Sequence, residues 1–145
     1  IEVSDSIESL KSFLGVKRRM EKISEINEIK IYDDFAHHPT AIRLSSQALR
    51  NKHPNRKILG IIELGSNTMS SGYHKKNLLD SFESINEALV LDPKGIYQGD
   101  NIFQSISALL EELIKTIKDY DIILIMTNKD SQKFIQPILE SLEEK

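Results

Sequence analysis

Residues 57–64 read KILGIIEL and form an almost continuously apolar run. A short run of this kind, rich in branched side chains, is typical of a strand that is buried on both faces of a parallel sheet. Two similar runs follow, EALVL at residues 87–91 and DIILIMTN at residues 121–128. Because such strands need helices on both faces of their sheet, these three runs predict an α/β fold.

Helical spacing of apolar residues fills the segments between these strands. Helices are predicted for residues 39–50, 74–82 and 102–117, and a closing helix for residues 134–142. Pro39 suits the first turn of its helix, where the missing N–H has no partner to lose. The alternation of strands and helices predicts right-handed crossovers and a Rossmann-like sheet that is mostly parallel.

The N-terminal part of the chain predicts a different arrangement. Residues 4–14 have the spacing of a short amphipathic helix. Residues 19–26 and 29–35 are extended segments joined by Asn27-Glu28, which indicates a β-hairpin. The predicted fold is therefore a single domain, residues 1–145, with a mostly parallel sheet, helices on both faces and an N-terminal β-hairpin.

Composition excludes several classes of protein. The chain has 145 residues, one domain's worth, with 19 basic and 22 acidic residues and a net charge of −3. That balance gives no general basic surface for nucleic acid. The absence of cysteine excludes disulfides, thiolate metal sites and a cysteine nucleophile. No apolar run approaches the roughly 20 residues needed to cross a bilayer, so neither nucleic acid nor a membrane is an expected partner.

Ligands of such folds bind beyond the carboxyl ends of the strands. Polar residues gather at the predicted strand ends, and the ones to inspect are Asp33, Asp34, His37, His38, Ser66, Asn67, Thr68, Asp92, Thr127, Asn128 and Lys129.

The segment DDFAHHP, residues 33–39, allows more than one interpretation. It can be a polar loop in which an aspartate and a histidine bond to loop and helix backbone. It can also be a nucleotide site, in which a carboxylate accepts from ribose hydroxyls and imidazole rings pack on a base. A metal site is disfavoured, because adjacent side chains on an extended segment point in opposite directions.

No complete phosphate-binding loop is present in the sequence. Residues 60–66 have two glycines at the spacing of a P-loop but lack its lysine, and their middle reads as strand. The basic run Lys17-Arg18-Arg19 is either a solvated face or contains one arginine directed at phosphate. The SNT segment at residues 66–68 either caps a helix or offers donors and acceptors to a polar substrate. His53 and His74 have no partner pattern and are expected at the surface.

Two motifs together resemble the carboxy-terminal domain of the Mur ligases: GVKRRME at residues 15–21 and YDDFAHHPTAI at residues 32–42, with SNTM at residues 66–69. The resemblance extends over essentially the whole chain. It implies a domain excised from a three-domain bacterial, cytoplasmic ligase that uses ATP to convert a carboxylate into an acyl phosphate, which an amine attacks. The amino-terminal domain would hold the UDP end of the substrate. The central domain would supply the phosphate loop and the Mg²⁺ ligands.

The form of these motifs favours the family member that joins UDP-N-acetylmuramate to the tripeptide L-Ala-γ-D-Glu-meso-diaminopimelate in peptidoglycan recycling; muramate–L-alanine ligation is the alternative. The resemblance implies that Arg19 meets the ATP phosphates, Asp34 contacts the ribose, and His37 and His38 lie beside the nucleotide. It places Ser66, Asn67 and Thr68 toward the incoming peptide. It implies no catalytic residue and no metal ligand in this domain, so the isolated domain is expected to be inactive.

Two loops depart from the family pattern. Glu63-Leu64-Gly65 stands where Glu-Pro-Arg is usual, and residues 127–131 (TNKDS) replace a glycine-rich loop. Both departures affect the expected recognition of the peptide and leave the predicted fold unchanged.

A receiver-like signalling module is the alternative from another class. Asp33-Asp34 with Thr127 and Lys129 imitates its acidic pocket. The sequence has no aspartate at the end of the central strand that would be phosphorylated in such a module. A third possibility, which the sequence leaves open, is a non-catalytic binding module that binds no nucleotide.

Overall fold

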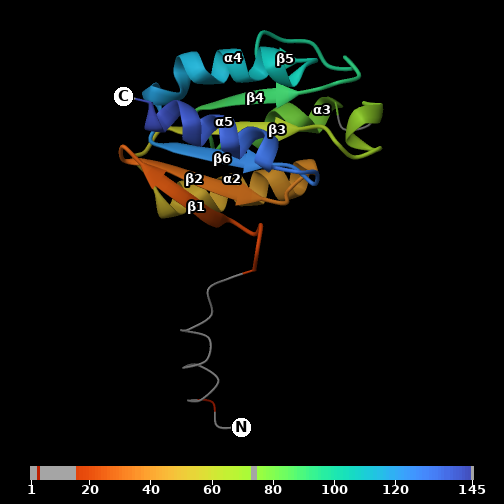
Figure 1. Ribbon diagram of the computed structural model, residues 1–145. Helices are drawn as coiled ribbons and strands as arrows, with labels where there is room; N and C mark the ends of the chain where they lie inside the picture. Colours follow the sequence, from red (N-terminus) through yellow and green to blue (C-terminus); the bar gives the residue numbers. More distant parts are fainter. Residues whose placement is uncertain (1–2, 4–15, 73–74, 145) are drawn as a thin grey trace.

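The three apolar runs form the parallel centre of a six-stranded sheet (Figure 1). They are β3 (Ile58–Glu63), β4 (Glu87–Leu91) and β6 (Ile122–Met126). β6 lies between β3 and β2 (Ile29–Asp34), and it is parallel to both. β1 (Glu21–Ile26) pairs antiparallel with β2 and forms the edge of the sheet. The order of the strands is β1-β2-β6-β3-β4-β5.

The structure is a computed structural model, and it describes residue 3 and residues 16–72 and 75–144. The helix predicted for residues 4–14 lies outside the described residues, as does His74. The predicted hairpin is confirmed. Its turn has positive φ at both Asn27 (51°) and Glu28 (67°), which is the conformation of the two-residue turn that matches the twist of a hairpin.

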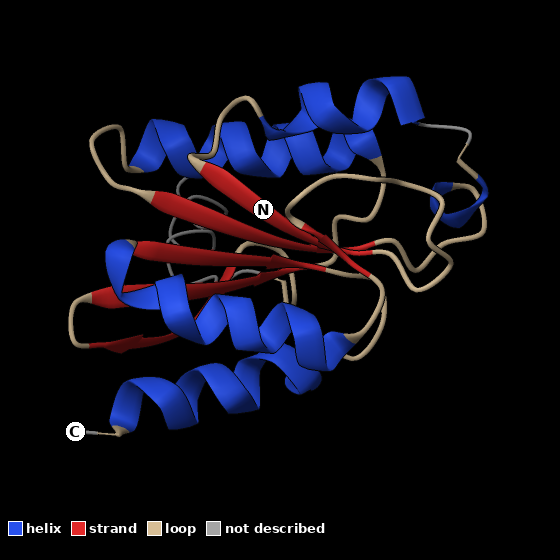
Figure 2. Ribbon diagram, turned by 90° about the horizontal axis from the view of Figure 1, so that it is seen from above, coloured by secondary structure: helices blue, strands red, loops and turns tan. Residues whose placement is uncertain are grey.

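Helices cover both faces of the sheet (Figure 2). One face packs against α2 (Pro39–Lys52), α3 (Lys75–Leu78) and the 3₁₀ turn η2 (Leu79–Phe82). The other face packs against α4 (Ile106–Thr116) and α5 (Gln132–Glu143). Two further 3₁₀ turns are η1 (Met69–Ser71) and η3 (Ile117–Asp119). The chain therefore has the predicted α/β architecture, Rossmann-like and mostly parallel.

The helix predicted for residues 102–117 is wrong at its beginning. Ile102–Phe103 form β5, a short strand that pairs parallel with Val90 and Leu91 of β4. The helix begins only after Ser105, whose hydroxyl accepts a hydrogen bond from the Ala108 N–H at 3.3 Å. The two apolar residues of β5 fit a helical stripe in the sequence, but their backbone pairs with the sheet edge because Ser105 caps the helix there.

The predicted helix at residues 74–82 is also modified. The structure divides its described part into a single α-helical turn and the 3₁₀ turn η2. Ser81 donates its hydroxyl to the Leu78 carbonyl within this segment. Side chains that bond to nearby backbone in this way compete with regular helical bonding, so the segment is short and tight.

The connections that follow β2 and β6 diverge from each other. The chain leaves β2 through α2 on one face, and it leaves β6 through α5 on the opposite face. At such a switch point the two connections diverge, and the space beyond the carboxyl ends of the strands stays open. The ends of β2, β6 and β3 are therefore where a ligand site is expected.

Candidate functional site

Asp34, at the end of β2, holds together the loops around it. Its Oδ1 accepts from the Ala36 N–H at 2.8 Å and from the Ser45 hydroxyl at 3.1 Å. Its Oδ2 accepts from the Met20 N–H at 2.7 Å. The side chain is 4% exposed. The carboxylate thus connects β2, the first turns of α2 and the segment before β1.

Asp33 points to the opposite side of β2. Its Oδ2 accepts from the Ser131 hydroxyl at 2.8 Å and from Arg18 Nε at 3.2 Å. The same guanidinium donates from Nη2 to the Thr127 carbonyl at 2.7 Å and lies 5.2 Å from the centre of the Phe35 ring. The two aspartates therefore diverge, as the alternation of an extended segment predicts.

A third buried carboxylate lies beside this pair, at the end of β3. Glu63 accepts from the Thr127 hydroxyl at 2.6 Å and from Lys133 Nζ at 2.5 Å. It is 4% exposed. Sequence reasoning did not select Arg18, Glu63, Ser131 or Lys133. The available signal was Glu63 itself, an acid that ends an otherwise apolar strand.

Arg19 is placed differently from its neighbour. Its side chain is exposed and has no hydrogen-bond or ion-pair partner among the described residues. It lines a surface hollow of about 550 Å³ together with Lys17, Lys22 and Lys52 and with one acid, Glu21. Lys22 is paired with Glu25, whereas Lys52 lies over the Tyr32 ring at 5.7 Å. A protein with net negative charge thus presents a local group of cations, which favours an anionic ligand.

The two histidines of the DDFAHHP segment take separate positions. His37 Nδ1 lies 2.9 Å from the Phe35 carbonyl, which can only accept, so Nδ1 carries the proton. Nε2 of the neutral ring is then an acceptor. His38 is exposed at the N-cap position of α2 and lines a hollow of about 300 Å³ that also contains Arg43 and Asp80.

The SNT segment follows β3 as predicted. Ser66 accepts from the Met69 N–H at 3.2 Å and lies 3.3 Å from the Thr68 hydroxyl. Ser66 thus accepts from the first residue of the 3₁₀ turn η1, whose N-cap residue Thr68 makes no side-chain cap hydrogen bond. Asn67 and Thr68 are exposed at this edge of the sheet.

The two loops that depart from the family pattern touch each other. A Cβ atom on Gly65 would lie 2.8 Å from Asn128 Oδ1 and 2.8 Å from Lys129 Cε. The loop after β6 therefore occupies the space that a larger residue at position 65 would need. An exposed lysine, Lys129, lies at this place.

Asp92 and His53, two further residues from the sequence analysis, make contacts inside the domain. Asp92 is fully buried, and its Oδ2 accepts from the Tyr97 N–H at 2.8 Å. His53, which was expected at the surface, is half-buried, and its Nε2 lies 3.2 Å from the Tyr32 hydroxyl. Burial lowers the His53 pKa below its ordinary value of 6.5, and nearby cations, Lys30 first among them, lower it further.

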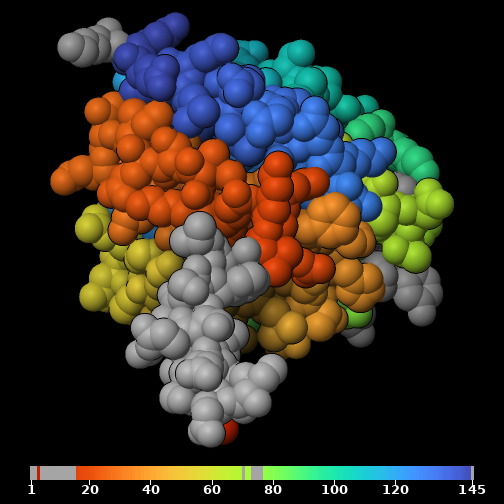
Figure 3. Space-filling model, turned by 60° about the horizontal axis from the view of Figure 1, so that its bottom comes forward, coloured from red at the N-terminus to blue at the C-terminus, as the bar shows by residue number. Residues whose placement is uncertain are grey.

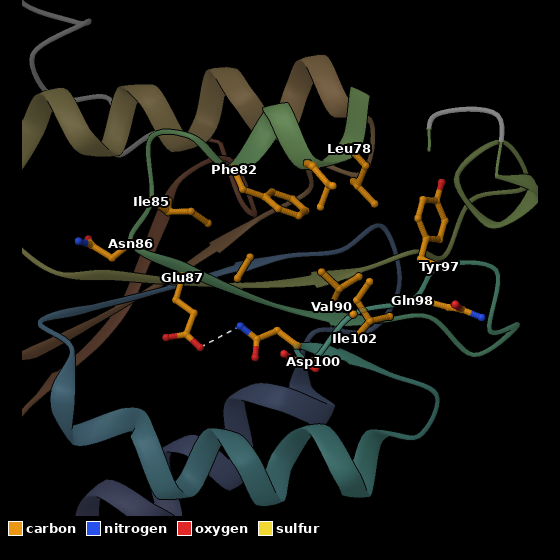
Figure 4. A pocket seen from close by; sticks show the side chains of 14 residues that line it. Leu78, Phe82, Ile85, Asn86, Glu87, Val90, Tyr97, Gln98, Asp100 and Ile102 are labelled. Carbon is orange, nitrogen blue, oxygen red and sulfur yellow. Dashed lines mark hydrogen bonds between the residues drawn. The ribbon is translucent and has the colours of Figure 1, made fainter. Parts of the chain in front are cut away.

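A separate cavity of about 450 Å³ lies between η2 and the β4–β5 edge (Figure 4). Its walls are mainly apolar, with Leu78, Phe82 and Val90 pointing inward. Glu87 at its rim is already engaged, because its oxygens accept from Asn101 and from the Tyr120 hydroxyl. Asn86, Gln98, Asp100 and Asn101 also line this cavity.

Residues 16–72 and 75–144 contain no group of three or more histidine, aspartate or glutamate side chains that could hold a metal ion. Within the same ranges, no helix has the length and apolar character to cross a membrane.

Comparisons with known proteins bear on the family of this chain. The family model described as "Mur ligase, glutamate ligase domain" matches residues 18–129. UDP-N-acetylmuramate–L-alanyl-γ-D-glutamyl-meso-2,6-diaminoheptandioate ligase of Escherichia coli is 33% identical over 154 residues, which cover 98% of this chain and 34% of the relative. The chain thus spans about a third of the length of that curated relative.

Solved structures give the same result. The murein peptide ligase of Psychrobacter arcticus superposes with a TM-score of 0.78 and is 30% identical, and the match covers 100% of this chain and 34% of that one. A second solved structure is a domain from Haemophilus ducreyi, which is described as part of a UDP-N-acetylmuramate:L-alanyl-γ-D-glutamyl-meso-diaminopimelate ligase. It superposes with a TM-score of 0.70 and is 29% identical. It covers 86% of this chain and 99% of that one. The family match over residues 18–129 argues against the receiver-like alternative.

Proposed function

Because this chain belongs to the Mur ligase family through its glutamate ligase domain, we propose that it closes the nucleotide and peptide site of an ATP-dependent amide-bond ligase. The proposed reaction joins UDP-N-acetylmuramate to the tripeptide L-Ala-γ-D-Glu-meso-diaminopimelate. A relative with this reaction in its name matches 98% of the chain. L-Alanine is the alternative acceptor.

The observation that carries the nucleotide part of the proposal is that Arg19, in its basic hollow, has no side-chain partner among the residues that the structure describes. A guanidinium without an internal partner is available to a phosphate oxygen, and its planar fork suits two parallel hydrogen bonds. Lys17 and Lys52 line the same hollow and add positive charge. The ATP phosphates are therefore assigned to this place.

Asp34, His37 and His38 are assigned to the rest of the nucleotide. Asp34 Oδ2 accepts one hydrogen bond within the domain, and a carboxylate oxygen has capacity for a second, from a ribose hydroxyl. His37 offers Nε2 as an acceptor because its Nδ1–H is used by Phe35. His38 is exposed one residue further along. These side chains lie on the same turn between β2 and α2.

The acceptor peptide is assigned to the edge formed by the ends of β3 and β6. Ser66, Asn67 and Thr68 present hydroxyl and amide groups there. Lys129 adds a cation, which suits an acceptor that carries carboxylates. The family pattern has an arginine at position 65, where this chain has glycine. Lys129, from the loop after β6, lies next to that position.

Catalysis requires the two further domains. The described residues offer no metal cluster and, in this sequence, no complete phosphate loop. We assign the Mg²⁺ ligands and the phosphate loop to the central domain and the UDP end to the amino-terminal domain. Reacting groups held by separate domains can be aligned only when the domains close.

The test is steady-state kinetics on the full-length ligase that carries this domain. Arg19→Ala is expected to raise the KM for ATP by about tenfold or more, because one charge-assisted hydrogen bond is worth roughly 1.5–3 kcal/mol. Arg56→Ala is the matched control, since Arg56 is exposed and pairs with Asp121 away from the site. An unchanged KM for ATP in the Arg19 variant would argue for a binding module without nucleotide.

The same assay decides the acceptor. Product is expected with the tripeptide and not with L-alanine. Thr68→Ala is expected to raise the KM for the tripeptide while the KM for ATP stays within about twofold, because its hydroxyl lies at the peptide edge. Equal turnover of L-alanine would select the alternative reaction.

A further inference from the structure

Arg18 and Arg19 are neighbours in sequence with opposite surroundings. Arg18 is 24% exposed and donates to Asp33 and to the Thr127 carbonyl. Arg19 is exposed and has no side-chain partner among the described residues. One arginine is thus bound inside the domain, and the other is presented outward from the same short segment.

The backbone of this segment adopts an unusual conformation. Arg18 has φ of 55° and Met20 has φ of 48°, so two residues with side chains lie in the left-handed region on either side of Arg19. Such a conformation costs free energy for residues other than glycine, and it persists only where surrounding contacts enforce it.

Contacts on both sides of Arg19 enforce this conformation. The Arg18 N–H donates to Glu21 Oε2 at 2.8 Å, and the Arg18 carbonyl accepts from the Phe35 N–H at 2.9 Å. The Met20 N–H donates to Asp34 Oδ2 at 2.7 Å. Each peptide group next to Arg19 is therefore fixed to β1 or to the end of β2.

The side chain of Arg18 extends this attachment across the sheet. It joins the segment to the end of β6, 109 residues away along the chain, through the Thr127 carbonyl. It also lies against Asp33, which Ser131 holds from the beginning of α5. In Figure 3 the red segment that begins at residue 16 lies between the orange residues of β1 and β2 and the blue C-terminal part. The segment is thus fastened to β1, to the end of β2 and to Thr127 directly after β6.

We propose that Arg18 is a positioning residue that holds Arg19 in the conformation that meets phosphate. The proposal rests on the proposed nucleotide role of Arg19. A guanidinium whose backbone is already fixed loses less conformational freedom on binding, so its hydrogen bonds contribute more to affinity. Arg18 itself keeps its donors on Asp33 and Thr127 and has no contact with the ligand.

The experiment is a double-mutant cycle in the full-length ligase with the KM for ATP as readout. Arg18→Lys keeps the charge and loses the planar fork that reaches two acceptors. It is expected to raise the KM for ATP about fivefold when Arg19 is present and by less than about twofold in the Arg19→Ala background. If the role of Arg18 were purely structural, Arg18→Lys would raise the KM for ATP by the same factor with and without Arg19.

Arg56→Lys is the matched control, because Arg56 also pairs with an aspartate but lies away from this segment. It is expected to leave the KM for ATP unchanged. If Arg18→Lys fails to fold, as its thermal unfolding would show, Arg18→Gln serves in its place and retains a donor for the Thr127 carbonyl.

The outcomes separate the two proposals. An unchanged KM in Arg19→Ala overturns the nucleotide role of Arg19, and the positioning role falls with it. A raised KM in Arg19→Ala with equal effects of Arg18→Lys in both backgrounds, or none in either, overturns the positioning role alone.

Discussion

Single residues in this domain combine packing with protonation, and His53 is the clearest case. His53 is the C-cap residue of α2, and its Nε2 lies 3.2 Å from the Tyr32 hydroxyl. Burial and the nearby cations Lys30, Lys52 and Arg56 lower its pKa below 6.5. The folded state therefore favours the neutral ring.

His53 is predicted to make stability depend on pH. The unfolded chain takes up a proton near the ordinary pKa of 6.5, whereas the folded chain takes it up only at lower pH. The unfolded state thus binds more protons in that window, so the contribution is complete above the unfolded pKa and is lost as the pH falls toward the folded value. Thermal unfolding between pH 8 and about pH 5 should show a smaller decline for His53→Asn than for the wild type. Parallel curves for the two proteins would contradict this.

At the scale of elements, buried polar contacts join strands that are distant in sequence. Glu63 at the end of β3 accepts from Thr127 after β6 and from Lys133 in the first turn of α5. Asp33 in β2 accepts from Arg18, which precedes β1, and from Ser131 at the beginning of α5. These contacts hold the carboxyl edge of the sheet in one arrangement.

Glu63→Ala is predicted to destabilise the domain by about 2 kcal/mol, since Thr127 loses its acceptor and a buried ion pair is broken. The value lies at the low end of the usual range because Lys133, at 30% exposed, can turn toward water. Glu111→Ala is the control, because Glu111 is 73% exposed in its pair with Lys115 and should change stability by less than about 0.5 kcal/mol. Denaturant unfolding measures both variants, and equal values would show that the buried contact contributes nothing extra.

Elements also show where sequence patterns succeed and where they do not. The buried strands β3, β4 and β6 are predictable because each is a continuous apolar run. β5 was missed because two residues are too short to reveal a period, and their pairing with β4 depends on a distant part of the chain. Of the candidate site, the aspartates and histidines of the DDFAHHP segment were selected from sequence and stay a prediction, whereas Arg18 and Lys133 were not selected.

At the scale of the whole molecule, we propose that the candidate site is one wall of a larger site. The chain spans about a third of its Escherichia coli relative. A corresponding domain from Haemophilus ducreyi has been solved, and 99% of it matches this chain. Lys17, Arg19 and Lys52, which line the same hollow, are all exposed.

The isolated chain is predicted to unfold cooperatively and to form no product from ATP, UDP-N-acetylmuramate and the tripeptide. The full-length ligase supplied with the same substrates should turn over, because only closure of its domains aligns the reacting groups. A calorimetric scan checks the first part, and an assay of phosphate release checks the second. Phosphate release by the isolated chain above its buffer control would contradict the assignment of catalysis to several domains.

The sequence by itself determined the α/β class, the hairpin and the edge of the sheet where the site lies, because these follow from local periodicity and from polar residues at strand ends. Tertiary structure alone decided which strand ends meet. The insertion of β6 between β2 and β3 brings Thr127 to Glu63, 64 residues apart, and Ser131 to Asp33, 98 residues apart. The physical reason is that a strand's apolar pattern encodes its burial, whereas its neighbours are chosen by long-range pairing that no local period records.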